Sequence, residues 1–144
     1  MSGGTPKAIE FTLYTRAVPK GMPRTYLNPK TGRPIVAKPP KTRRWEEFVA
    51  HAAQDHLTED TPLDCPLKLK AYVYVPRPKS CPKSRLFPTV RPDLKNLIAS
   101  VEDGMNGILY VDDRLICMHD TGKFYGDPPR VEIGLYPLTE EDLP

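Results

Sequence analysis

The sequence lacks the features that mark several well-known classes of protein. No apolar run approaches the ~20 residues that a membrane-spanning helix needs, so we expect no contact with a membrane. The first residues, MSGGT, lack the apolar stretch of a secretory signal. Three cysteines form no C-x-x-C pair, which argues against a disulfide scaffold or a zinc ribbon. Together these absences predict a cytoplasmic protein, and a chain of 144 residues suits one compact domain.

Other motifs are also missing. The three histidines show no H-E-x-x-H spacing, so we assign none of them to a metal. Nothing matches the aromatic motif of an RRM or a zinc knuckle, which lowers the prospect of a dedicated RNA-binding module.

The small net charge of +3 is a cancellation between blocks of opposite sign. Residues 1–44 hold ten lysines and arginines against the single acid Glu10. Residues 45–64 hold six acids and no lysine or arginine, residues 65–95 are again basic, and the remainder is acidic. Such sorting of charge indicates an anionic partner, although solvated basic loops are the simpler alternative.

Hydrophobic periodicity predicts one domain that mixes strands and helices. Apolar spacing of three and four residues indicates an amphipathic helix over residues 42–57, with Thr42 as N-cap, and a second helix over residues 94–105. Between the first strand and the first helix lies a long Pro- and Lys-rich loop, with a short hairpin near residues 28–32. Alternating or β-branched runs indicate strands at residues 9–14, 67–75, 108–111, 115–119 and 130–136. We expect a single α+β domain over residues 1–144, with flexible tails at 1–8 and 139–144.

Aspartates stand on either side of the second predicted helix. Asp93 precedes the helix, and Asp112 and Asp113 follow it after an Asn-Gly turn and a short strand. Each has a structural alternative, since Asp93 suits an N-cap and the pair suits an Asx-type turn. Because the unit folds back on itself, we expect it to bring Asp113 towards Asp93. Two carboxylates beside basic loops are suited to Mg²⁺-dependent cleavage of a phosphodiester.

These residues carry a family resemblance. The segments RPDLKNL and GMNGILYVDD, with PKGMPR and PPKTRRWEEFVAHAA upstream, resemble the RusA family of crossover junction endodeoxyribonucleases, small DNA resolvases of bacteria and their phages. The resemblance spans residues 9–137. It implies a small mixed β-sheet with two main helices, and a homodimer that binds four-way DNA junctions and makes paired nicks. It also implies Mg²⁺ or Mn²⁺ at each active site, in the cytoplasm of a bacterium or a phage-infected host.

The resemblance also assigns roles to individual residues. Asp93 falls on the first catalytic aspartate of the family motif, Asp113 on the later one, and Asp112 is its neighbour. Two positions depart from the motif: Lys95 replaces an aspartate, and Ala99 replaces the catalytic lysine. Since positions i and i+4 share one helical face, we expect Lys95 to address the scissile phosphate while the three aspartates hold the metal. The alternatives are a junction-binding protein with weakened or lost catalysis and an RNA-binding or phage accessory protein.

The basic N-terminal block supplies candidate contacts to the DNA backbone. Lysine acts there as a point charge and arginine as a planar fork. The candidates are Lys20, Arg24, Lys41, Arg43 and Arg44. Aromatic side chains that are candidates for stacking on unpaired bases, with core packing as the alternative, are Tyr14, Tyr26 and Phe87.

Overall fold

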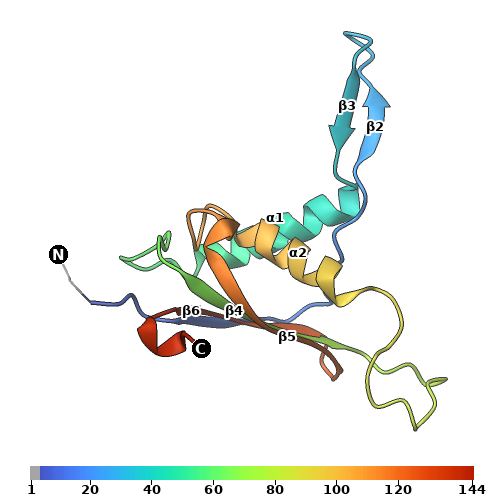
Figure 1. Ribbon diagram of the computed structural model, residues 1–144. Coiled ribbons are helices and arrows are strands. Elements are labelled where there is room, and N and C mark those ends of the chain that lie inside the picture. Colours follow the sequence, from blue (N-terminus) through green and yellow to red (C-terminus); the bar gives the residue numbers. More distant parts are fainter. Residues whose placement is uncertain (1–3) are drawn as a thin grey trace.

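The computed structural model describes residues 4–144, so residues 1–3 of the predicted N-terminal tail lie outside the described residues. A four-stranded sheet in the order β1-β6-β4-β5 forms one layer of this part of the chain (Figure 1). Strand β4 pairs with β5 in parallel and with β6 antiparallel, which makes the sheet mixed. The strands are β1 (Ile9–Leu13), β4 (Leu67–Val75), β5 (Ile116–Tyr125) and β6 (Arg130–Pro137).

Two helices cover one face of this sheet, α1 (Pro40–Gln54) and α2 (Leu94–Met105) (Figure 1). The alternation of β4 explains this arrangement, because every second side chain from Leu67 to Val73 is buried on the face under the helices. The parallel pairing of β4 and β5 requires a crossover, and α2 provides it. The predicted α+β fold with a mixed sheet and two main helices is therefore confirmed.

The helices approach each other closely at one glycine. A Cβ added to Gly104 of α2 would lie 2.7 Å from the side chain of Val49 on α1. Val49 is fully buried, as is Ala53 one turn further along α1. A residue without a side chain therefore sets the distance between the two helices.

The basic loop contains a hairpin that stands clear of the body (Figure 1). Its strands β2 (Arg24–Leu27) and β3 (Pro34–Ala37) are antiparallel. The turn closes through hydrogen bonds from Asn28 N to the carbonyl oxygen of Arg33 and from Gly32 N to that of Asn28, and Gly32 adopts the left-handed conformation at φ +70°. This confirms the hairpin expected near residues 28–32.

Two local predictions, on Thr42 and on residues 108–111, differ from the structure. The first helix begins at Pro40, and Thr42 is not its N-cap. The Thr42 side chain is buried, and its Oγ1 accepts a hydrogen bond from Gly21 N at 3.0 Å, so tertiary contacts use this hydroxyl. Within residues 108–111, only Tyr110 forms isolated bridges rather than a strand. Near the C-terminus a capped 3₁₀ turn, η2 (Glu140–Asp142), lies within the segment expected to be a flexible tail.

Among the described residues, no helix has the length and apolar character that crossing a membrane requires.

Replacing Gly104 by alanine is expected to destabilise the fold, although alanine normally favours a helix interior. The added methyl group would overlap Val49, and overpacking of this kind costs about 1–3 kcal/mol. Thermal melting should show a fall of about 3–8 °C. The fall in melting temperature of the double variant Gly104→Ala/Val49→Ala should be smaller than the sum of the falls of the two single variants. The smaller side chain at position 49 leaves room for the added methyl group. A higher melting temperature for Gly104→Ala would contradict this account.

Candidate active site

Asp93 lies at the start of α2 in a basic groove. The groove has a volume of about 1010 Å³, and four cationic side chains line it together with Asp93: Arg16, Lys20, Lys41 and Arg91. Asp93 is the N-cap of α2 by position, but among the described residues its side chain makes no capping hydrogen bond. The capping alternative therefore does not account for the carboxylate, which remains available to a ligand.

Lys123 holds the turn that carries Asp93. Its ammonium group donates hydrogen bonds to the carbonyl oxygens of Val90 and Pro92, each at 2.8 Å. Lys123 lies on β5, so these two bonds fix the entry to α2 against the sheet. The sequence analysis did not single out this lysine, because nothing in its local pattern marks a contact to a segment 31 residues away.

The other end of α2 carries a cluster of acids. After α2 the chain turns sharply, and the buried Tyr110 donates a hydrogen bond to the carbonyl oxygen of Glu102 at 2.6 Å. Asp112 and Asp113 follow directly. Asp112 accepts a hydrogen bond from the backbone of Arg114 at 3.4 Å, which is the Asx-type turn considered above.

Crowding of carboxylates affects the ionisation of this cluster. Partial burial, reinforced by the neighbouring Asp112 and Asp103, raises the pKa of Asp113, and Lys20 opposes the rise. Burial also raises the pKa of Glu102, against the effect of the imidazole of His119 3.0 Å away. Negative charge at this end of α2 is thus incompletely compensated, a condition that a cation relieves.

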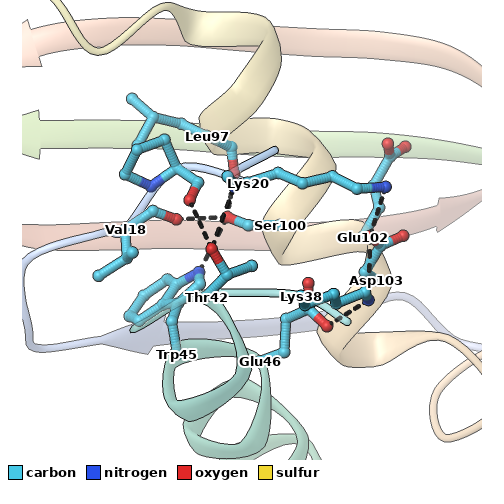
Figure 2. Close-up of polar contacts among 12 residues, drawn as sticks. Val18, Lys20, Lys38, Thr42, Trp45, Glu46, Leu97, Ser100, Glu102 and Asp103 are labelled. Atoms are coloured by element: carbon cyan, nitrogen blue, oxygen red, sulfur yellow. Dashed lines mark hydrogen bonds and ion pairs between the residues drawn. The ribbon is translucent and has the colours of Figure 1, made fainter. Parts of the chain in front are cut away.

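Two lysines reach the acidic end from the basic block (Figure 2). Lys20 Nζ lies 3.0 Å from Asp103 Oδ2, and Lys38 Nζ lies 3.7 Å from the same atom and 2.7 Å from Glu46 Oε1. The Oδ2 atom of Asp103 is buried, and within residues 4–144 its approaches to the lysines lack the direction of hydrogen bonds. Lys20 also lines the groove of Asp93 and therefore touches both ends of the site.

The structure does not bring Asp93 and Asp113 together within one chain. Asp113 lies in the electrostatic environment of Asp103, and the ten residues from Asp93 to Asp103 rise by about 15 Å along the helix. Figure 1 shows the start of β5 beside the C-terminal end of α2, away from the end that begins with Leu94. The expected approach of Asp113 to Asp93 is therefore wrong for a single chain, because α2 is straight and its return turn is short.

Carboxylate oxygens are the hard ligands that Mg²⁺ prefers. In the part of the chain that the structure describes, no group of three or more His, Cys, Asp or Glu side chains is placed to hold a metal ion. Mg²⁺ is commonly held by one or two carboxylates together with substrate phosphate and water. The adjacent Asp112 and Asp113 fit that requirement, and burial with the nearby Asp112 and Asp103 raises the pKa of Asp113.

The remaining predicted residues are distributed around this site. Lys95 is exposed on the first turn of α2 and is not part of the groove lining, whereas Asn96 is. Arg43 and Arg44 are exposed on the first turns of α1, and Arg24 is exposed on the hairpin. The aromatic candidates are exposed rather than buried in the core: Tyr14, Tyr26 and Phe87.

Sequence reasoning did not single out Glu102 and Asp103, the two acids near the C-terminal end of α2. A signal was present, because Asn96, Ser100 and Asp103 recur at spacings of four and three and so share one face of α2. Polar residues at helical spacing indicate a face that contacts other polar groups, and here that face receives the segment containing Lys20.

The variant Asp113→Asn is expected to stabilise the metal-free protein at pH 7.5. A carboxyl group whose pKa is raised by folding lowers stability once the pH exceeds that pKa, and asparagine removes this cost. Thermal melting in EDTA should show a gain of about 2 °C, absent near pH 3, where the aspartate is itself uncharged. The exposed control Glu59→Gln should show no such gain. A loss of stability at pH 7.5 would contradict the proposed crowding.

Comparisons with known proteins show which proteins this chain is similar to. A relative from Bacillus subtilis (strain 168), "Uncharacterized protein YqaN", is 33% identical over 135 residues, which cover 87% of this chain and 93% of the relative. The family described as "Endodeoxyribonuclease RusA" matches residues 17–136, which include both helices, the acidic cluster and the groove lining except Arg16. The chain therefore belongs to the RusA family of endodeoxyribonucleases.

Proposed function

We propose that this chain is a divalent-metal-dependent, structure-selective endodeoxyribonuclease that resolves four-way DNA junctions by paired hydrolysis of phosphodiesters. It acts as a single nuclease domain and as a homodimer, in the cytoplasm of a bacterium or a phage-infected cell. The observation that carries this proposal is the uncapped carboxylate of Asp93 among four cationic side chains of one groove. A groove of this charge attracts a polyanion and presents a potential metal ligand to it.

The cationic side chains bind and orient the DNA. Lys41 and Arg91 line the same groove as Asp93, where backbone phosphates would lie. Arg43 and Arg44 extend the same positive surface along α1. Such contacts fix the register of the backbone and carry no sequence information.

We assign the metal to Asp93, Asp112 and Asp113, with Mg²⁺ as the ion and Mn²⁺ as a substitute. A bound ion of this type supplies an activated water and neutralises charge that develops on the phosphate. Because about 15 Å of helix separates the two ends of α2, a centre that uses both ends takes Asp93 from one protomer and Asp113 from its partner. The dimer then has two such centres, as paired nicks require.

Lys95 is the residue of the site that departs most from the family pattern. It is exposed and two residues from Asp93, so a phosphate bound at the mouth of the groove is within reach of a lysine side chain. In the proposed role it contacts the scissile phosphate. The second candidate function is junction binding with weakened catalysis, which the replacement of a family aspartate by Lys95 favours.

Cleavage of a labelled four-way junction tests the proposed activity. With Mg²⁺ or Mn²⁺ the protein should make nicks at symmetric positions in opposing strands, and in EDTA it should bind the junction without cutting. Asp93→Asn and Asp113→Asn should each lower the cleavage rate by at least about 100-fold, as expected when transition-state stabilisation by a metal is lost. Binding without symmetric nicks under any divalent ion would contradict the enzyme and leave the second candidate.

Substitutions of Lys95 separate the two candidates. If Lys95 contacts the phosphate, Lys95→Ala should slow cleavage by about 10-fold or more, the loss of one charge-assisted contact. Lys95→Asp, which restores the family residue, should not then exceed the natural protein. Faster cleavage by Lys95→Asp, with no change for Lys95→Ala, would instead show that the lysine weakens catalysis.

The triple variant Lys41→Ala/Arg43→Ala/Arg44→Ala should bind junctions and duplexes less tightly. Each lost phosphate contact should also make the dependence of binding on salt shallower, by about one unit of logarithmic slope. Fluorescence anisotropy over a range of salt concentrations measures both effects. The control Lys68→Ala/Lys70→Ala removes charge from the sheet face opposite the helices and should change neither. Unchanged affinity in the triple variant would show that these residues do not contact DNA.

A further inference from the structure

The β2–β3 hairpin has a rigid base and an exposed shaft. At its base, Gly21 N donates to Thr42 Oγ1 at 3.0 Å, and Lys38 Nζ donates to Glu46 Oε1 at 2.7 Å. A Cβ on Gly21 would lie 2.8 Å from the side chain of Pro39, so the segment that enters the hairpin packs closely against the residue that precedes α1. Beyond this base, every residue of β2 is exposed, and Figure 1 shows the hairpin projecting from the helices.

Both faces of this hairpin are apolar. In the observed register Thr25 pairs with Val36 and Leu27 with Pro34, so these four side chains share one face. The exposed fractions of Leu27 and Val36 on this face are 74% and 69%. The opposite face carries Tyr26 paired with Ile35, which are 45% and 44% exposed, and, nearer the base, Arg24 paired with Ala37.

A ribbon with apolar side chains on both faces is unusual in water, since an isolated hairpin gains little stability on its own. A surface for docking to one partner face needs only one apolar side. Two apolar sides fit a ribbon that is inserted between two apolar layers. Stacked bases provide such layers, and proteins that kink DNA insert leucine, isoleucine or proline side chains between base pairs.

The charge of the surrounding chain selects nucleic acid as the occupant. Residues 16–44 contain nine lysines and arginines and no acidic residue. Lys30 and Arg33 lie at the turn of the hairpin, on either side of Gly32, where they would meet phosphates next to an inserted shaft. A four-residue strand spans about 13 Å, and a two-stranded ribbon fits within the ~12 Å major groove of DNA.

We propose that the β2–β3 hairpin is a wedge that enters the open centre of a branched DNA and separates its base pairs with Leu27 and Val36. This inference rests on the proposed action on branched DNA and adds the device that recognises the branch. The base of the hairpin lies at the candidate site, because Lys38 contacts Asp103 and the Lys20 segment precedes β2. A branch held on the wedge is thereby set at a fixed distance from the strands to be cut.

A four-way junction with 2-aminopurine at the branch point tests the wedge, in EDTA to prevent cleavage. Binding of the natural protein should raise the fluorescence, because the probe loses its stacking neighbours. Leu27→Thr/Val36→Thr places at both positions a β-branched residue, which favours a strand, but removes the apolar surface. It should abolish most of the fluorescence rise and weaken junction binding by about 10-fold, with duplex affinity unchanged.

The matched control is Lys30→Gln/Arg33→Gln at the turn of the same hairpin. It should weaken binding to junction and duplex alike and make the salt dependence shallower, while the fluorescence rise at saturation remains. Thermal melting of both double variants should match the natural protein, because the changed side chains lie outside the core.

The outcomes separate the wedge from the function on which it rests. If the natural protein binds junction no better than duplex, the proposed function fails and the wedge fails with it. If it prefers the junction but Leu27→Thr/Val36→Thr keeps the full fluorescence rise and affinity, the wedge alone is wrong. If that variant changes from dimer to monomer in sedimentation equilibrium, the apolar shaft binds a second copy of the chain, and the proposal is overturned.

Discussion

The hydroxyl group of Ser100 is the contact on which the arrangement of the site depends. Trp45 of α1 donates a hydrogen bond to it at 2.9 Å, and it donates in turn to the carbonyl oxygen of Val18 at 2.7 Å (Figure 2). The hydroxyl group is buried, and the carbonyl oxygen of Leu97, one turn back along α2 and 2.9 Å away, is a second acceptor within its reach. This contact joins both helices to the segment that carries Lys20. The basic groove, the ion pair with Asp103 and the base of the hairpin all follow from where that segment lies.

Electrostatics divides the site into two ends with opposite requirements. At the start of α2, cations surround a single carboxylate, which suits the binding of phosphate. At its end, acids exceed the available cations, and burial together with the neighbouring Asp112 and Asp103 raises the pKa of Asp113. Lys20 connects the two ends through its contact with Asp103. A metal ion and a DNA phosphate supply, between them, the charges that each end lacks, so binding of DNA and binding of metal are expected to support each other.

The sequence predicted the fold well wherever a pattern was local. The bounds of β4 and α2 follow directly from period-two and period-3.6 spacing, and turn residues indicated the hairpin. Contacts between distant segments were not predictable in the same way. Thr42 looks like an N-cap from its neighbours alone, but Gly21 uses its hydroxyl. Likewise, the spacing of Asp93 and Asp113 in the sequence gave the number of residues between them but not the path of the chain. The length of α2 separates the two carboxylates within one chain. The hydrogen bonds from Lys123 to the turn before α2 join segments far apart in the sequence, and no short motif predicts such a contact.

The central claim is that the cleaving centre uses carboxylates from both ends of α2 and therefore from two protomers. Mixing the variants Asp93→Asn and Asp113→Asn tests it most directly, after unfolding and refolding together to allow exchange of chains. A mixed dimer then has one centre with both natural aspartates, Asp93 from one chain and Asp113 from the other. The account predicts that each variant alone is inactive on a four-way junction, and that the mixture with Mg²⁺ regains nicking of single strands, at up to about one quarter of the natural rate for random pairing of chains. A mixture as inactive as its components, in protein shown to be mixed dimer, would contradict it.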